Sequence, residues 1–153
     1  MKKVGIVAAG SYVPARKLTN ADLEKMVDTT DEWITTRTGI KERRIAGHDE
    51  HASDLAFKAA QDCLAQTAYR PELLIAATST AEKSCPYQAS IVAHRLGLTD
   101  LAAFDVNAVC SGFLATCCAI RVKSFILLSS PFKNHYKYSC QYSRYGSRTS
   151  RTR

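Results

Sequence analysis

The chain has 153 residues, of which 46% are hydrophobic and 23% charged, a composition that fits one globular domain and excludes a disordered or collagen-like chain. It contains no apolar run long enough to span a membrane, and the apolar stretch after Met1 is too short for a secretory signal, so we expect a cytoplasmic protein with no membrane partner. The net charge of +7 suggests nucleic-acid binding, but residues 1–120 carry 13 basic and 14 acidic residues, whereas residues 121–153 carry 8 basic residues and no acidic ones. The basic excess therefore lies in the C-terminal segment alone.

The first third of the sequence predicts one strand and two short helices. Residues 3–8 (KVGIVA) form a β-type run that ends before a turn. A helix is expected over residues 20–27. A second helix is predicted to begin after Thr29, because Thr29 and Glu32 fit a capping box, and to end at Gly39.

The next stretch alternates helices with apolar strands. Residues 53–68 carry one apolar stripe at helical spacing, and residues 86–96 are again helical. The runs at 73–78 and 102–106 are continuously apolar or nearly so, which is typical of strands buried in a parallel sheet, and a last helix is expected to follow and to end near residue 120. This order predicts an α/β domain over residues 1–120.

Residues 121–153 differ from the rest in being rich in Ser, Tyr and Arg, and no aliphatic residue follows Leu128. We interpret this segment as an unpatterned basic tail, either disordered or translated out of frame. Tyrosines interleaved with basic residues could also stack on single-stranded nucleic acid, but a solvated tail without specific binding is the favoured interpretation.

The sequence contains six cysteines, and without an export signal we expect them to be reduced. No Cys-x-x-Cys or His-x-x-x-His spacing occurs, so no metal site is predicted. Cys110 differs from the others because it follows the strand at 102–106 and opens the next helix, where unpaired N–H groups and the helix dipole favour a thiolate. Cys110 is thus either a nucleophile or a buried structural cysteine; the full set is Cys63, Cys85, Cys110, Cys117, Cys118 and Cys140.

Trp33 and Arg37 lie four residues apart and should share one helix face. An indole and a guanidinium placed in this way can form two flat walls around a planar base such as adenine. The alternative is that Arg37 stacks on a Trp33 that packs at the edge of the core.

Several motifs resemble, in order and approximate spacing, the beta-ketoacyl-acyl-carrier-protein synthase III family. The resemblance covers nearly all of residues 1–120 and stops there. The residues that carry it are Thr19–Thr29, Asp31–Ile34, Arg37–Arg44, Ser53–Ala56, Ala77–Thr80, Leu96–Gly97, Phe104–Val106 and Cys110–Phe113.

The resemblance implies the N-terminal half of a thiolase-like fold and an acyltransferase that starts fatty acid synthesis. Such enzymes condense an acyl-coenzyme A primer, here expected to be acetyl-coenzyme A, with malonyl-acyl carrier protein; coenzyme A enters as a substrate thioester and no cofactor is needed. By position, Cys110 matches the acyl-accepting nucleophile, Trp33 and Arg37 match residues that hold the adenine end of coenzyme A, and Thr29 matches a further contact there. Cys85 stands where better-known members have an aromatic residue of the acyl pocket.

The family also implies a homodimer and a catalytic His and Asn in a second half of the protein. The four histidines of this chain match neither position; they are His48, His51, His94 and His135. We therefore expect a truncated, inactive synthase III. The alternative is a non-catalytic fragment that pairs with a full-length subunit or binds polyanions through its basic tail.

Overall fold

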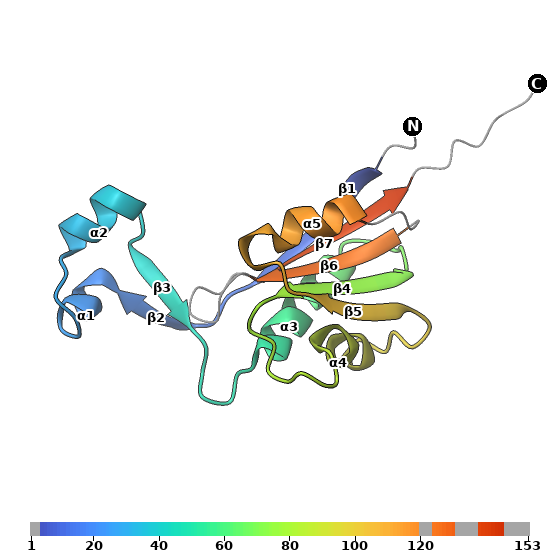
Figure 1. Cartoon of the computed structure of the whole chain (residues 1–153), viewed down its shortest axis with the longest axis horizontal. Helices are drawn as coiled ribbons and strands as arrows, with labels where there is room; N and C mark the ends of the chain where they lie inside the picture. The colour runs from blue at the N-terminus through green and yellow to red at the C-terminus, as the bar shows by residue number, and fades with distance from the viewer. Residues whose placement is uncertain (1–3, 120–123, 131–137, 146–153) are drawn as a thin grey trace, which may run out of the picture.

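The computed structural model describes residues 4–119, 124–130 and 138–145 of the chain (Figure 1). Its body is built on a five-stranded sheet in which β4, β5 and β6 are parallel, while β7 is antiparallel to both of its neighbours. In spatial order the strands are β1 (Val4–Tyr12), β7 (Tyr138–Tyr145), β6 (Ser124–Ser130), β4 (Leu73–Thr78) and β5 (Ala102–Val106).

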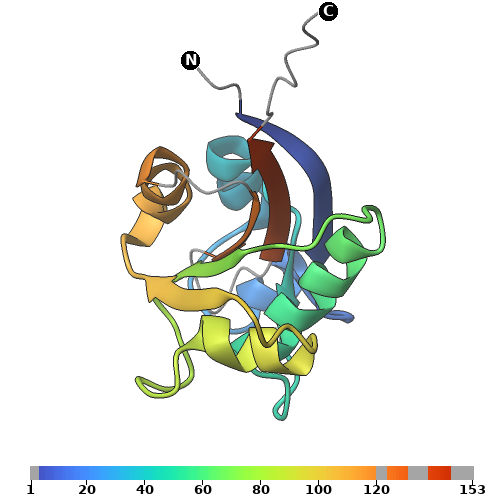
Figure 2. The same ribbon diagram turned by 90° about the vertical axis from the view of Figure 1, so that its right-hand side faces the viewer.

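Helices cover both faces of this sheet, as Figure 2 shows: α3 (Ala52–Leu64) and α4 (Gln88–Arg95) lie on one face and α5 (Gly112–Ala119) on the other. The fully buried strand β4 serves both layers, because successive side chains of a strand point to opposite faces. Leu74 and Ala76 pack with α3 and α4, whereas Ile75 and Ala77 form a second cluster with Phe113 of α5. The predicted α/β layering is confirmed.

The predicted apolar stripe of α3 is the centre of the larger core. The predicted member Leu64 is partly buried and the other five are buried: Leu55, Ala56, Ala59, Ala60 and Cys63. Small residues on this stripe let the helix approach β1 closely. A Cβ atom added at Gly10 would lie only 2.3 Å from the backbone nitrogen of Cys63.

Helix α4 is held at its N-terminus by a side chain from the sheet. Its N-cap residue, Tyr87, makes no side-chain capping bond. Instead, the two carboxylate oxygens of Asp105 on β5 accept hydrogen bonds from the backbone N–H groups of Gln88 and Ala89, both at 2.8 Å. This contact fixes α4 against the carboxyl-terminal half of β5.

A smaller lobe projects beside the sheet in Figure 1 and holds four short elements. They are the antiparallel strands β2 (Arg16–Thr19) and β3 (Glu42–Ile45) and the helices α1 (Asn20–Glu24) and α2 (Asp31–Thr38). Buried Asn20 connects them: its amide nitrogen donates to Asp31 at 2.6 Å and to the carbonyl of Ile40 at 2.8 Å, and its oxygen accepts from Arg43.

Two details of the lobe differ from the sequence prediction. The N-cap of α2 is Thr30 rather than Thr29, because the Thr30 hydroxyl accepts from the N–H of Trp33 at 3.1 Å. Helix α1 ends at Glu24, three residues earlier than expected, since the next residues form turns that lead into α2. Gly39 ends α2 in the left-handed conformation, as predicted.

The segment predicted as an unpatterned tail contributes β6 and β7 to the sheet, so the structure differs there from a wholly disordered segment. The short apolar run that begins at Phe125 supplies a β-strand pattern, and Ile126 is fully buried in the larger core. The rest of residues 121–153 lies outside the described residues. No helix in the described ranges is long and apolar enough to cross a membrane.

Candidate functional site

Cys110 lies in a one-turn 3-10 helix, Val109–Ser111, between β5 and α5. This places it where the sequence predicts it, just beyond the carboxyl end of β5 and before the first residue of α5. Strand β5 itself is not the buried strand that its apolar run predicts, because it lies at the edge of the sheet and leaves Phe104 41% exposed. Open α/β sheets commonly bind ligands at this end of their strands. The Cys110 side chain is exposed, so the alternative of a buried structural cysteine does not hold in this structure.

The backbone around Cys110 forms a tight turn. Val109 has a φ of 44°, in the left-handed region that a β-branched residue rarely adopts, and the N–H of Ser111 donates to the carbonyl of Ala108 at 2.9 Å. Such local strain is typical of functional turns. The turn presents Cys110 to solvent while the chain reverses into α5.

Gly112 allows α5 to start directly above the sheet. A Cβ atom on Gly112 would lie 3.0 Å from the Cβ of Ala77 on β4, so the space next to this glycine is filled by a neighbouring strand. One turn later, the buried hydroxyl of Thr116 donates to the Gly112 carbonyl at 2.7 Å. These contacts hold the first turn of α5, and with it the peptide that follows Cys110, against β4.

Three other cysteines in the described part of the chain are exposed: Cys85 in the loop after β4, and Cys117 and Cys118 near the end of α5. Although the residue is exposed as a whole, partial desolvation of the Cys117 thiol, reinforced by the neighbouring Cys118, raises the pKa of Cys117 above its ordinary value. Cys117 therefore carries less thiolate at neutral pH than an unperturbed thiol, which makes it a poorer nucleophile.

Trp33 and Arg37 share one face of α2, as their spacing predicts. The guanidinium carbon of Arg37 lies 5.1 Å from the centre of the Trp33 ring, and the indole is 54% exposed. The two groups are thus in direct cation–π contact rather than spaced around an open slot. Of the two interpretations of this pair, the structure shows the one in which Arg37 stacks on Trp33. The indole is exposed, however, and does not pack at the edge of the core.

Thr29 precedes the N-cap of α2 and is half-buried. It lies in the same lobe as Trp33, four residues before it. The structure keeps these lobe residues apart from Cys110, which lies in the body (Figure 1). Only a ligand long enough to reach from the lobe to the body could contact both sets of residues.

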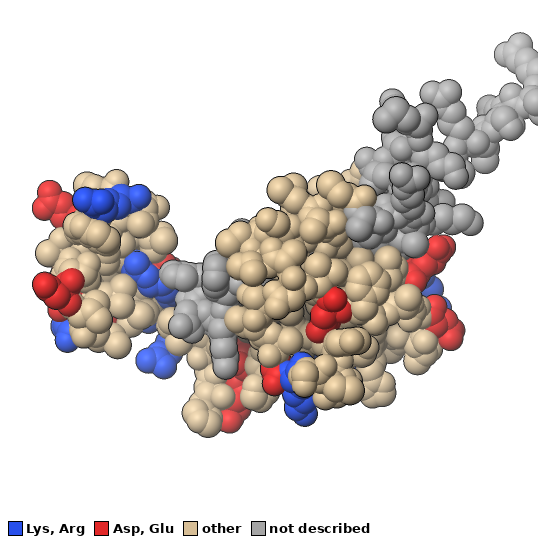
Figure 3. All heavy atoms as spheres, viewed as in Figure 1, with Lys and Arg blue, Asp and Glu red and all other residues tan. Residues whose placement is uncertain are grey.

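Basic side chains gather on the lobe, where Figure 3 shows several Lys and Arg atoms beside acidic ones. Many are engaged within the lobe. Lys17 and Arg44 lie opposite each other on β2 and β3 and share the carboxylate of Glu42, at 3.1 and 3.2 Å. Hydrogen bonds from Lys17 lower the pKa of Glu42, and Arg44 adds to this effect.

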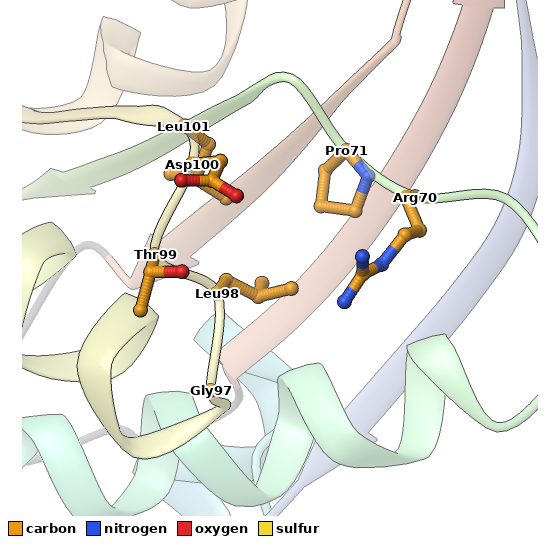
Figure 4. A pocket seen from close by; sticks show the side chains of 7 residues that line it. All are labelled: Arg70, Pro71, Gly97, Leu98, Thr99, Asp100 and Leu101. Carbon is orange, nitrogen blue, oxygen red and sulfur yellow. The ribbon is translucent and has the colours of Figure 1, made fainter.

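A shallow pocket of about 130 Å³ lies far from these features, at the amino ends of β4 and β5. Arg70 and Pro71 form one side and residues 97–101 the other (Figure 4). Since Cys110 follows the carboxyl end of β5, this pocket is at the opposite end of the strands. In the described part of the chain, no three His, Cys, Asp or Glu residues gather as a metal site would require.

The architecture and the cysteine turn define a thiolase-like α/β fold, and comparisons identify its family. No family model matches the chain. Beta-ketoacyl-[acyl-carrier-protein] synthase III 2 of Halalkalibacterium halodurans is 49% identical over 116 residues, 74% of this chain and 35% of the relative. The synthase III of Caldanaerobacter subterraneus is 52% identical over 113 residues, 72% of this chain and 34% of the relative.

Solved structures with a similar fold belong to the same family as these relatives. The 3-oxoacyl-[acyl-carrier-protein] synthase III of Aquifex aeolicus has a TM-score of 0.84 at 32% identity, covering 95% of this chain and 55% of that one. The Thermus thermophilus enzyme has a TM-score of 0.80 at 35% identity, covering 95% and 52%. The chain belongs to the beta-ketoacyl-[acyl-carrier-protein] synthase III family of condensing acyltransferases. It spans about a third of the curated relatives by sequence and about half of the solved ones by structure.

Two residues that position the candidate site were not identified from the sequence. Asn20 holds α2 through Asp31, and Asp105 holds α4 from the strand that leads to Cys110. Both act through contacts distant in sequence, which no local pattern reveals. The burial of Asn20, which makes several hydrogen-bond partners necessary, is itself visible only in the structure.

Proposed function

We propose that this chain carries the acyl-accepting half of a synthase III, with Cys110 as the nucleophile and coenzyme A thioesters as the acyl donors. The observation that carries the proposal is the exposed Cys110 in a strained turn between β5 and α5. The family membership supports it, since the relatives named above are acyl-carrier-protein synthases.

In the proposed step, the Cys110 thiolate attacks the carbonyl carbon of the acyl group. The bond between that carbon and the coenzyme A sulfur then breaks, coenzyme A leaves as a thiolate, and the acyl group remains on Cys110 as a thioester. The N–H of Gly112, the first of α5, already donates to the carbonyl of Val109, so the N–H groups that follow it are the ones proposed to stabilise the oxyanion of the tetrahedral intermediate. The transfer requires no metal or cofactor.

The adenine end of coenzyme A is proposed to bind on Trp33 and Arg37, with Thr29 beside them. This assignment suits a long donor, because the lobe that carries α2 lies apart from Cys110 in the body. Acetyl-coenzyme A as the primer, malonyl-acyl carrier protein as the acceptor, a homodimeric state and a cytoplasmic location belong to the same proposal.

We expect acyl transfer without condensation, since no histidine of this chain matches the decarboxylating residue of the family. Incubation with acetyl-coenzyme A should place one acetyl group on the peptide that contains Cys110, as read by mass spectrometry. Cys110→Ala should remove the label and Cys118→Ala, which changes another exposed thiol, should retain it. Equal acetylation of several cysteines, or ketoacyl product formed with malonyl-acyl carrier protein, would contradict the proposal.

A second candidate is a non-catalytic fragment that pairs with a full-length subunit. It is favoured by large apolar side chains that remain open on the α5 side of the sheet, where Phe104 is 41% and Leu114 65% exposed. Large exposed apolar side chains of this kind are found at protein–protein interfaces. Co-purification with a full-length synthase III, combined with no acetylation of Cys110, would favour this candidate over the first.

A further inference from the structure

Two adjacent cysteines, Cys117 and Cys118, lie near the C-terminal end of α5, and both are exposed. Among the helices described in the body, α5 alone covers its face of the sheet, so this surface is open to solvent (Figure 2). Cys118 is one of the two causes that raise the pKa of Cys117, which is the effect expected of two thiols close enough to influence each other. The two residues therefore form a dithiol on an open helix surface.

A direct disulfide between these two neighbours does not fit the helix. Adjacent Cα atoms are about 3.8 Å apart, below the roughly 4.4–6.8 Å that disulfides usually span. Adjacent side chains also leave a helix about 100° apart, so the two sulfurs point away from each other. A larger atom bonded to both sulfurs removes this conflict, because it lets them stay apart. The pair suits a bridging ligand better than it suits oxidation.

Leu114 is the third group at this position, three residues before Cys117 and four before Cys118. Residues three and four apart adjoin on a helix surface, and helical side chains lean toward the N-terminus, so both thiols lie on the side of Leu114. Leu114 is 65% exposed. An open apolar side chain thus accompanies both thiols.

These three groups decide which thiol-binding ligand fits. Trivalent arsenic forms three bonds, and inorganic arsenite takes up to three thiols. In the described part of the chain, no third His, Cys, Asp or Glu joins this pair to make a cluster. An arsenical that already carries one carbon substituent needs only two thiols, and its substituent can pack on Leu114.

We propose that Cys117, Cys118 and Leu114 form a binding site for trivalent arsenicals with one organic substituent, and that an aryl substituent is preferred. With hydrated phenylarsine oxide, which carries two hydroxyl groups on arsenic, two As–S bonds replace two As–O bonds. Each thiol proton leaves with one hydroxyl group as water. Arsenic stays trivalent and the sulfurs are not oxidised, so the step requires no oxidant. The site is separate from the proposed acyl transfer to Cys110.

Titration of the full chain with phenylarsine oxide tests the dithiol. One equivalent should bind, protect both Cys117 and Cys118 from iodoacetamide, withstand excess glutathione and be removed by the dithiol 2,3-dimercaptopropanol. Cys118→Ser should weaken binding about a hundredfold or more, because the second bond is then no longer intramolecular. Cys117→Ser should do the same, and Cys85→Ser, which changes another exposed thiol, is the matched control and should bind as the parent chain does. Equal affinity in the parent chain and in both variants of the pair, or loss of binding in Cys85→Ser or Cys110→Ser, would overturn the proposal.

A second titration tests the part assigned to Leu114, with phenylarsine oxide and methylarsonous acid as probes. The parent chain should bind the phenyl compound more tightly. Leu114→Ala should weaken binding of the phenyl compound about three- to tenfold and change binding of the methyl compound little, because only the larger group covers the leucine. An unchanged ratio of the two affinities in Leu114→Ala would overturn the aryl preference. Acetylation of Cys110 is measured separately, so neither result decides the proposed function.

Discussion

Gly10 shows how one residue decides whether the main helix can pack on the sheet. Strand β1 passes so close to α3 that a methyl group at Gly10 would lie 2.5 Å from the carbonyl oxygen of Ala59 and 2.8 Å from the Cα of Cys63. These are backbone atoms, which cannot rotate away as a flexible side chain can. The sequence predicts that the first strand ends at residue 8, before a turn that includes Gly10, whereas β1 continues through Gly10 to Tyr12. Nothing in a local pattern reveals a helix 50 residues later that needs the space beside Gly10.

Gly10→Ala should therefore destabilise the fold by about 1–3 kcal/mol or more, through forced separation of α3 from β1. The free energy of unfolding in urea measures this effect. Gly5→Ala on the same strand is the matched control, since an added Cβ there meets nothing within 4 Å. Equal midpoints for the two variants would show that α3 does not pack at this distance.

The rates at which the exposed thiols are alkylated should depend differently on pH. Because burial and Cys118 raise the pKa of Cys117, its thiolate fraction is low at pH 7 and rises only at higher pH. Alkylation by iodoacetamide should thus be slower at Cys117 than at Cys110 near neutral pH, and the difference should narrow as pH increases. Buried Cys63 should label only on unfolding, which peptide mass spectrometry can follow in the same samples.

At the scale of elements, the long periodic segments could be predicted and the short ones could not. The stripe on α3 and the apolar run of β4 are buried as expected, because each pattern is local and strong. Strands β2 and β3 were missed: each has four residues, and charged side chains such as Arg16 and Arg43 dominate them. Their stability comes from pairing with each other and from Asn20, which are contacts that the sequence order does not show.

The link between β5 and α4 gives a prediction at this scale. Asp105→Ala removes both acceptors for the N–H groups of Gln88 and Ala89 and should cost about 1–2 kcal/mol, the usual cost of losing a helix cap. Amide hydrogen exchange should increase first in the opening turn of α4. Asp100→Ala, an exposed aspartate in the loop before β5, should leave that exchange rate unchanged.

A second link ties β1 to α3 through Glu50, which accepts from Tyr12 at 2.9 Å and from Lys58 at 3.0 Å. Burial pushes the pKa of Glu50 upward, but the bonds from Lys58, Tyr12 and Gly47 outweigh it, and the pKa lies below its ordinary value of 4.5. A depressed carboxyl pKa adds stability above the unfolded-state value and loses it as pH falls through the folded-state value.

Glu50→Gln should therefore lower the free energy of unfolding at pH 7, and the gap to the parent chain should close as pH falls below about 4.5. Urea titrations at several pH values measure both curves. Asp49→Asn, at a fully exposed neighbouring position, should follow the parent chain throughout. A gap that persists at low pH would mean that Glu50 contributes through packing rather than charge.

At the scale of the whole molecule, the candidate site is divided between two parts with different architectures. The cysteine turn depends on the sheet, because α5 rests on β4 through Gly112, whereas the Trp33–Arg37 stack depends on the lobe held by Asn20. The sequence could identify each part through its own spacing. It could not show that Arg37 covers the indole, since i,i+4 spacing allows either an open or a closed pair.

The sheet itself depends on β6, the strand that joins its two halves. Ile126 pairs with Leu74 on one side, and β6 pairs with β7 on the other, so without β6 the strands β1 and β7 lose their connection to β4 and β5. Ile126 is fully buried in the core under α3. The segment with the least regular composition thus supplies the centre of the sheet.

Ile126→Ala should accordingly destabilise the chain by about 2–5 kcal/mol, the usual cost of a large-to-small change in a packed core. Leu114→Ala, at a residue 65% exposed on α5, is the matched control and should shift the unfolding free energy by no more than about 0.5 kcal/mol. Denaturant unfolding followed by far-UV circular dichroism measures both. If the two variants unfold at the same midpoint, β6 does not lie in the core, and the sheet must be stabilised without residues 124–130. A marked loss in Ile126→Ala alone would mean that the support of α5, and with it the turn that holds Cys110, depends on a strand from the basic segment, because β6 pairs with β4, on which α5 rests.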